Sequence, residues 1–247
     1  MAKTGIACLL IFFAPAIAVA DEILVAVAAN FSAPMYELVT EFARQNQHEV
    51  NVAYGSSGRL YAQISNGAPF QLFFSADQDK PRRLEQAGLA IWRSRFTYAT
   101  GQLVLWTATE GMTVDSESLL SQSFNRLALA NPALAPYGQA AVEVMDSLAV
   151  ADASRPRWVL GENIAQTFQF VETENAELGF VALSQVWRSG AMTRGSGWIV
   201  PTSLHSPIKQ DAVLLKRAEQ CAVCVEFLEF TRSPVAQRIL QSYGYSQ

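Results

Sequence analysis

Short apolar runs alternate along the chain with longer segments in which apolar residues recur every three or four positions. The apolar runs predict buried strands at residues 23–29, 50–54, 70–75, 96–99, 102–106, 126–130, 157–160, 178–182, 198–201 and 210–215. The helical spacing predicts helices that begin near Ser32, Gly58, Pro81 and Ile164 and after Gln139, a short helix at 184–187, and two C-terminal helices at 218–231 and 235–243. Strands that alternate with helices indicate an α/β fold.

Asn30 stands where the first buried strand is expected to end and the first helix to begin. Ser32 and Pro34 suit a helix start, and Met35 and Leu38 continue it at the spacing of one buried face. In an open α/β sheet, ligands bind in the crevice beyond the carboxyl ends of the strands. A helix N-terminus there offers unpaired N–H groups and a positive dipole end, which favour an anion. We therefore predict an anion site at Asn30.

Three later corners between a strand and a helix repeat this arrangement, near Ser57, Tyr137 and Ile164. Ser56 or Ser57 suits a helix cap, and Gly58 lets a ligand approach the backbone, although an ordinary cap without a ligand explains that stretch equally well. None of the four corner residues is basic. The corners predict one anion held by neutral groups in a cleft between two lobes.

The long segment at 96–123 separates the two sets of corners, and it suggests where the lobes divide. We predict a first lobe from residues 21–101 and 206–247, and a second lobe from residues 102–205. The sequence shows no internal repeat that would support this division.

The first 20 residues have the pattern of a secretory signal peptide. Lys3 precedes an apolar region at residues 5–17, and Ala18-Val19-Ala20 suits cleavage before Asp21. The apolar region is shorter than the ~20 residues that a membrane-spanning helix needs. The formal charge of −4 becomes −5 without Lys3, so the exported chain is mildly acidic and unsuited to nucleic acid.

The two cysteines that remain after removal of the signal peptide, and the two histidines, add little chemistry to this picture. Cys221 and Cys224 fall inside the helix predicted at 218–231, whereas redox Cys-x-x-Cys motifs lie at helix starts, so we expect a structural role. A local disulfide or a redox pair is the alternative. His48 and His205 are far apart in the sequence, which argues against a histidine metal site. We expect no cofactor.

Seven groups of residues, in order along the whole mature chain, resemble the periplasmic molybdate-binding proteins of ABC-type transporters. They are 27–31, 55–60, 67–69 with 75–77, 131–132 with 136–138, 161–163, 178–179 and 243–245. The resemblance implies a two-lobed periplasmic binding protein of type II, with the ligand in the cleft between the lobes. It also implies that the lobes close on molybdate or the nearly isosteric tungstate, which is then delivered to a membrane permease. We expect a monomer that is not an enzyme.

By motif position, the resemblance implies that Asn30 and Ser57 are ligands from the first lobe. The backbones of Tyr137 and Ile164 would be ligands from the second lobe, and Ala29 would contribute its main chain. These groups would contact the oxyanion and would not ligate the metal directly.

The chain departs from part of that family at two positions. Some members have Ser where Asn30 stands, and a Tyr that reaches the anion from where Ala182 stands. An alanine methyl donates no hydrogen bond, so Ala182 is excluded as a side-chain ligand. We expect the Asn30 side-chain amide and the main chain around Tyr137 to restore the donors, as in the Asn-containing branch. Arg59 and Arg93 are expected to be solvated or structural.

Two other classes of function remain open at this point. The chain could bind another solute, such as sulfate, phosphate, iron or an organic anion, and sulfate differs from molybdate mainly in its shorter bonds. An exported serine hydrolase that uses Ser57 is the second alternative. Against it, Gly55-Ser-Ser-Gly58 is not Gly-x-Ser-x-Gly, and both histidines fall in loops.

Overall fold

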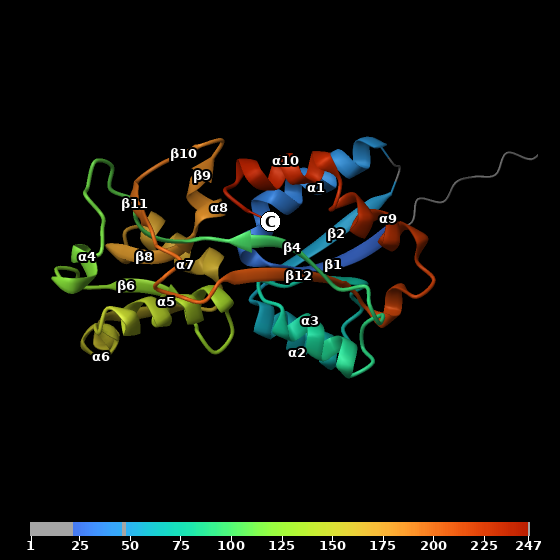
Figure 1. Cartoon of the computed structure of the whole chain (residues 1–247), viewed down its shortest axis with the longest axis horizontal. Coiled ribbons are helices and arrows are strands. Elements are labelled where there is room, and N and C mark those ends of the chain that lie inside the picture. Colours follow the sequence, from blue (N-terminus) through green and yellow to red (C-terminus); the bar gives the residue numbers. More distant parts are fainter. Residues whose placement is uncertain (1–21, 46–47, 247) are drawn as a thin grey trace, which may run out of the picture.

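Two five-stranded sheets, each covered by helices, form two lobes in the computed structural model (Figure 1). The structure describes residues 22–45 and 48–246, so the signal peptide expected at 1–20 lies outside the described residues. Among the described residues, no helix combines the length and the apolar character needed to cross a membrane.

The first sheet has the strand order β2-β1-β3-β12-β4. Strand β1 (Glu22–Ala28) pairs in parallel with β2 (Glu49–Gly55) on one side and β3 (Leu72–Phe74) on the other. Strand β12 (Ile208–Leu214) is antiparallel to both β3 and β4 (Phe96–Gly101). Strand β1 leads to helices on one face of the sheet, and β2 leads to a helix on the other face. The point at which the connections diverge to opposite faces therefore lies beside the carboxyl end of β1.

The second sheet has the order β11-β5-β8-β6-β7. Strand β6 (Leu127–Ala130) pairs in parallel with β7 (Trp158–Gly161) and β8 (Leu178–Ala182). Strand β5 (Leu103–Thr107) is antiparallel to β8 and to β11 (Ser196–Ile199). The two sheets therefore share one topology, in which β6 and β7 correspond to β1 and β2, although the sequence shows no repeat.

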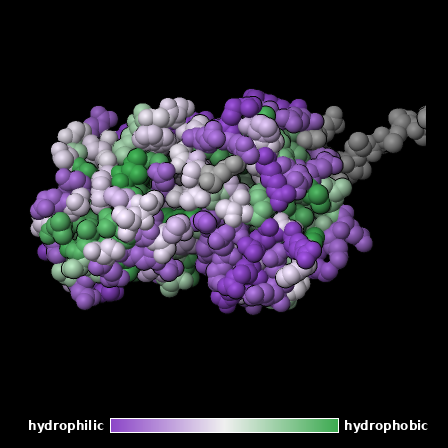
Figure 2. All heavy atoms as spheres, viewed as in Figure 1, coloured by the Kyte–Doolittle hydropathy of each residue, from purple (hydrophilic) through white to green (hydrophobic). Residues whose placement is uncertain are grey.

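Helices cover both faces of the first sheet (Figure 1). Helices α1 (Ser32–Gln45), α9 (Ala222–Phe230) and α10 (Pro234–Ser242) share one apolar core with the sheet, while α2 (Ser57–Ser65) and α3 (Asp79–Gln86) lie on the other face. The predicted spacing in α1 is confirmed, because Met35, Leu38 and Phe42 are buried on one side. Hydrophilic residues gather on the outer surface of the lobe that carries the charged helix α3 (Figure 2).

The second sheet is covered in the same way. Its first core includes α4 (Glu117–Leu120), α5 (Pro136–Ser147) and α6 (Ala151–Ser154). Its other core includes α7 (Ile164–Glu172) and α8 (Leu183–Val186). Smaller elements complete the chain: the 3-10 turns η1 (Ala29–Phe31), η2 (Arg155–Arg157) and η3 (Lys216–Ala218), and the hairpin of β9 (Trp187–Arg188) and β10 (Ala191–Met192).

The chain passes between the two sheets twice. It leaves the first sheet between β4 and β5, where Gln102 alone separates the strands, and it returns through residues 200–207 between β11 and β12 (Figure 1). Two short connections of this kind suit a hinge between lobes.

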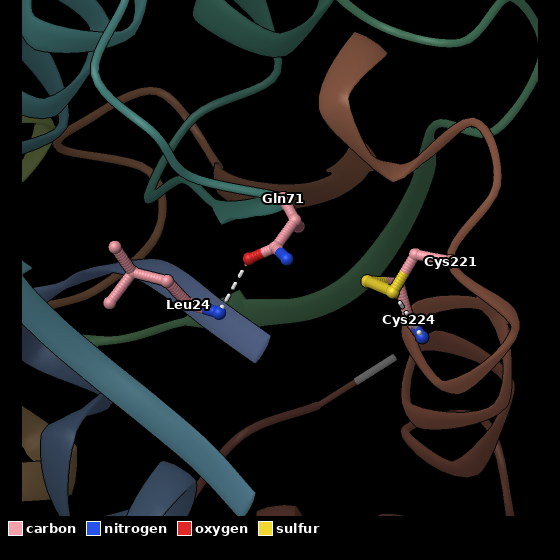
Figure 3. Close-up of a disulfide and its surroundings, with 4 residues drawn as sticks. All are labelled: Leu24, Gln71, Cys221 and Cys224. Atoms are coloured by element: carbon pink, nitrogen blue, oxygen red, sulfur yellow. Dashed lines mark hydrogen bonds between the residues drawn. A yellow bond between two sulfur atoms is a disulfide. The ribbon is translucent and has the colours of Figure 1, made fainter. Parts of the chain in front are cut away.

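Two predicted helix starts are wrong. Helix α5 begins at Pro136, before Gln139, because proline is favoured at the first helical position. Helix α9 begins at Ala222, so Cys221 is its N-cap residue and lies outside the helix interior. The two cysteines form a disulfide across this helix start, and the Cys221 sulfur also accepts the N–H of Cys224 (Figure 3). The local disulfide, the alternative that the sequence leaves open, is therefore present, and the expected position of Cys221 inside the helix is wrong.

Candidate functional site

The four predicted corners meet at one small cavity between the lobes. Its walls come from the carboxyl ends of β1 and β2 and from the segments that follow β1, β2, β3, β6 and β7. The lining residues are Ala28, Ala29, Asn30, Gly55, Ser56, Ser57, Ala76, Ala135, Pro136, Tyr137, Asn163 and Ile164. All five residues that the sequence assigns to the ligand are among them, and each is at most 4% exposed. Ala182 is buried at the end of β8 and is not among the lining residues.

On the first-lobe side, Ser57 is the first residue of α2 and Asn30 lies in the turn η1. The Ser57 hydroxyl accepts a hydrogen bond from the backbone N–H of Ala76, with a distance of 2.9 Å from Ala76 N to Ser57 Oγ. A hydroxyl that accepts in this way still has its own hydrogen to donate. The geometry therefore suits Ser57 to donate to an acceptor in the cavity.

On the second-lobe side, Tyr137 is the second residue of α5 and Ile164 is the first residue of α7. The Asn163 side chain caps α7 by accepting from the N–H groups of Ala165 and Gln166. The Gln185 amide also donates to the Ile164 carbonyl oxygen at 3.1 Å, which fixes the start of the helix. The start of α7, and with it Ile164, is thus held by contacts within the second lobe.

The backbone N–H groups at this cavity that have no acceptor in the described part of the chain include those of three helix starts, at Ser57, Tyr137 and Ile164. The first residues of a helix have no intrahelical acceptor, so their N–H groups need a cap, water or a ligand. Three helix starts that converge on one cavity also bring three positive dipole ends together. This arrangement can bind an anion without a cation.

None of the described residues that line the cavity carries a charge. The nearest basic residue in the sequence, Arg59, forms an ion pair with Glu162 of the other lobe, and both side chains are about half exposed. Beside this pair, the Gly58 N–H donates to the carbonyl oxygen of Leu134 at 2.8 Å. These two contacts join the lobes next to the cavity.

The Asn30 side chain has different partners from those expected. Its amide nitrogen donates to Gln210 Oε1 at 2.8 Å and to the Tyr245 hydroxyl at 2.9 Å, so both hydrogens are used within the protein. The Asn30 carbonyl oxygen accepts from the Ser184 hydroxyl at 2.7 Å. These bonds show that the Asn30 side chain helps to fix the turn that lines the cavity.

The partners of Asn30 belong to a larger buried polar network, which consists of Asn30, Tyr98, Tyr137, Ser184, Gln210 and Tyr245. Gln210 Oε1 also accepts from the Tyr98 hydroxyl at 2.9 Å, and Gln210 Nε2 donates to the Tyr137 hydroxyl at 3.3 Å. Tyr137 comes from the second sheet's α5, whereas Tyr98 and Gln210 come from β4 and β12 of the first sheet. The network thus connects the two lobes behind the cavity.

Burial keeps the tyrosines of this network protonated. It raises the pKa of Tyr98 and Tyr137 well above the ordinary value of 10, and neighbouring tyrosines add to the effect. Burial raises the pKa of Tyr245 to about 12, although hydrogen bonds with Ser184 and Asn30 oppose the rise. All three hydroxyls are therefore neutral and available as donors near pH 7.

Local sequence patterns do not identify the supporting residues of this network. They place Gln210 only at the start of a buried strand, and Tyr98 within another. The available signal is the polar pair Gln210-Asp211 at the start of a strand that is apolar beyond it, because buried polar side chains need partners. The partners themselves are 180 and 215 residues away from Asn30, beyond what local patterns reveal.

Comparison with known proteins gives this architecture a family. Residues 23–246 match the family described as bacterial extracellular solute-binding protein. The chain belongs to this family. One relative of this solute-binding protein is the molybdate-binding protein ModA of Azotobacter vinelandii, 46% identical over 227 residues that cover 92% of this chain and 90% of the relative. ModA of Rhodobacter capsulatus is 44% identical, over 92% of this chain and 89% of the relative.

Solved structures agree with the two-lobed, type II α/β fold. The periplasmic molybdate-binding protein of Azotobacter vinelandii superposes with a TM-score of 0.88 and 37% identity, and the match covers 91% of this chain and 99% of that one. The sulfate-binding protein SubI of Mycobacterium tuberculosis has a TM-score of 0.73 but 12% identity, over 91% and 86% of the two chains. The second likeness shows the fold alone.

The described residues hold no group of three or more His, Cys, Asp or Glu side chains that could bind a metal ion. The ligand roles remain predictions for the five residues Ala29, Asn30, Ser57, Tyr137 and Ile164. The structure adds that all five line one cavity.

Proposed function

We propose that this solute-binding protein captures molybdate in the periplasm and delivers it to the membrane permease of an ABC transporter. The observation that carries the proposal is the cavity in which three unpaired N–H groups and the Ser57 hydroxyl converge without a charged residue. The molybdate-binding relatives at 44–46% identity support the choice of ligand. Tungstate, with nearly the same size and charge, is expected to bind as well.

The chemistry of the lining favours a fully ionised oxyanion. Molybdate has no proton at neutral pH, so each of its oxygens accepts hydrogen bonds. A phosphate that carries a proton needs an acceptor for it, and no carboxylate is among the described lining residues. A site with donors and no strong acceptor therefore discriminates against phosphate.

The size of the cavity excludes large solutes. The space open to water-sized molecules is about 10 Å³, about what a single water molecule needs, so the lobes lie close together around the site. An organic anion of many atoms does not fit this volume. Sulfate is the second candidate, because it shares the charge and the shape of molybdate and its shorter bonds also fit a small cavity.

The ligand set follows from the free donors at the cavity. We propose that the hydroxyl and N–H of Ser57 and the N–H groups of Tyr137 and Ile164 bind the oxyanion. Ala29 and Asn30 contribute main chain from the turn η1, and the Asn30 amide acts by holding that turn.

We also propose that the protein is a transport component and not an enzyme. A nucleophilic Ser57 needs a base within hydrogen-bond reach, and neither His48 nor His205 lines the cavity with it. We further propose that the lobes divide at 101/102 and 205/206. The signal peptide is cleaved before Asp21, and the mature protein is a monomer. The two sheets support the lobe division, since their strands come from 22–101 with 208–214 and from 103–199.

Competition between anions tests the function. The mature protein is titrated by calorimetry with molybdate, tungstate, sulfate and phosphate, and thermal unfolding is followed with each anion in parallel. Molybdate and tungstate are expected to bind at least a hundredfold more tightly than sulfate and to raise the unfolding temperature accordingly. Equal responses to sulfate and molybdate would overturn the choice of molybdate, and no response to any of the four would overturn the oxyanion function.

A further inference from the structure

The disulfide between Cys221 and Cys224 has the position in its helix that redox-active cysteine pairs occupy. The sequence places both cysteines inside a helix, which is the reason to expect a structural role. In the structure, Cys221 is the N-cap residue of α9 and Cys224 lies in the first turn, bonded to it (Figure 3). A Cys-x-x-Cys pair at a helix start is an arrangement that stabilises a thiolate. The observed position therefore favours redox chemistry at this pair.

The two cysteines differ in access to solvent. Cys221 is partly exposed and is followed by the exposed residue Ala222, whereas Cys224 is 0% exposed and belongs to the core of the first lobe. Thiol–disulfide exchange begins when an external thiolate reaches one sulfur of the disulfide, so access decides which sulfur is attacked. An incoming thiolate can therefore attack Cys221 and not Cys224.

The start of α9 also suits the reduced form of Cys221. The Cys221 Sγ accepts the backbone N–H of Cys224 at 3.2 Å, and a thiolate in this place faces the positive end of the helix dipole. The first turn of α9 contains no acidic residue. The carboxylate of Glu219, two positions before Cys221, forms an ion pair with Lys216 that offsets its charge. The charges along this part of the chain thus leave a thiolate at Cys221 stabilised.

The oxidised form gains little from closing its loop. The two cysteines are three positions apart, and the chain-entropy model gives about 2 kcal/mol for so short a loop, at the low end for disulfides. A stabilised thiolate and a short loop both shift the equilibrium from the disulfide toward the dithiol.

We propose that Cys221 and Cys224 form a reversible redox site that reacts with a dithiol protein of the thiol–disulfide oxidoreductase class. The partner's thiolate attacks Cys221 Sγ, and the bond between the two cysteines breaks. Its electron pair leaves on the Cys224 sulfur, which takes up the proton of the partner's second thiol. The second sulfur of the partner then attacks the mixed disulfide and releases Cys221 as a thiolate. In total, two electrons reduce the disulfide of this chain and the partner's dithiol becomes a disulfide.

Equilibration of the mature protein with glutathione tests the site. The protein is incubated near pH 7 in about 10 mM total glutathione, at ratios from equal amounts to about a thousandfold excess of the reduced form, starting from both the oxidised and the reduced protein. Alkylation of free thiols and mass spectrometry give the reduced fraction. We expect half of the molecules to be reduced before the highest ratio. Fewer than about a tenth reduced at that ratio would overturn the proposal, because structural disulfides resist the glutathione pool in this way.

Two variants of the exposed residue Ala222 test the role of the helix start. Ala222→Glu places a carboxylate in the first turn beside Cys221, and Ala222→Gln is the neutral control of nearly the same shape. A thiolate at Cys221 predicts that Ala222→Glu shifts the equilibrium roughly two- to fivefold toward the disulfide, with no shift in Ala222→Gln. Equal equilibria in the two variants would overturn the stabilised thiolate. No molybdate is present in these titrations, so their result does not depend on the proposed function.

Discussion

At the scale of single residues, the proposed site separates side chains that we expect to touch the ligand from side chains that position the backbone. Ser57 has a free hydroxyl hydrogen, whereas the Asn30 amide is used within the buried network. Residue type and position predicted that both belong to the site. They did not predict this division of roles, because it depends on Gln210 and Tyr245, which are distant in the sequence.

The two variants Ser57→Ala and Asn30→Ala test this division. We expect Ser57→Ala to weaken molybdate binding by about 1.5–3 kcal/mol, the range for a hydrogen bond to a charged group. We expect Asn30→Ala to lower the free energy of unfolding without anion by about 2 kcal/mol, because two buried hydrogen bonds are lost. Calorimetry and urea unfolding measure the two quantities. An Asn30→Ala protein that keeps its stability but loses affinity would show that the amide contacts the anion directly.

At the scale of elements, the apolar periodicity predicted nearly every strand and helix of the two sheets. Its errors occur at helix starts, where one residue decides the boundary. Helix α5 starts earlier in the sequence than predicted, at Pro136, which brings Tyr137 into its first turn. Helix α9 starts later than predicted, after Cys221. Alternation of apolar residues does not encode such starts, since caps depend on local hydrogen bonds and covalent bonds.

The disulfide at the start of α9 gives a prediction at this scale. Its two cysteines are only three positions apart, and the chain-entropy model gives a stabilisation of about 2 kcal/mol for so short a loop. We expect the double variant Cys221→Ala/Cys224→Ala to lose about that much in urea unfolding, with molybdate affinity unchanged. The affinity should persist because α9 packs in the core on the far side of the first sheet from α2. A large loss of affinity would mean that α9 controls the cleft.

At the scale of the whole molecule, the sequence predicted two lobes and one shared cleft, but not how they are joined. The network of Asn30, Tyr98, Tyr137, Ser184, Gln210 and Tyr245 joins them through side chains from β4, β12, α5, α8 and the C-terminal segment. Each of these segments was predicted, but their packing around one point results from the shared topology of two sheets, which leaves no repeat in the sequence.

The tyrosines of the network make stability sensitive to alkaline pH. The folded state holds the pKa of Tyr245 at about 12, against about 10 in an unfolded chain, so the stabilisation is complete below pH 10. As the pH rises from 10 to 12, the unfolded state loses this proton first and stability falls, by roughly 2–3 kcal/mol for Tyr245. Urea unfolding at pH 8, 10 and 11 measures the slope. Tyr245→Phe should reduce the slope, and an unchanged slope would contradict this assignment.

We expect closure of the two lobes to depend on Gly58, whose N–H donates to the carbonyl oxygen of Leu134 in the second lobe. A Cβ atom at Gly58 would lie 2.8 Å from the Leu134 carbonyl oxygen and 3.0 Å from its Cα, so an alanine there meets backbone and not a movable side chain. We expect Gly58→Ala to hold the lobes apart and to weaken molybdate binding at least tenfold, although every proposed ligand is still present. Arg59→Ala is the matched control in the same turn. Its exposed ion pair with Glu162 contributes only about 0–1 kcal/mol, so the Arg59→Ala protein should close almost normally.

Small-angle scattering with and without molybdate measures closure as a decrease in the radius of gyration. The decrease should occur in the unaltered protein and in Arg59→Ala and be absent in Gly58→Ala. Full closure by Gly58→Ala would contradict this prediction, because it would show that the backbone at Leu134 moves to accommodate the added Cβ atom.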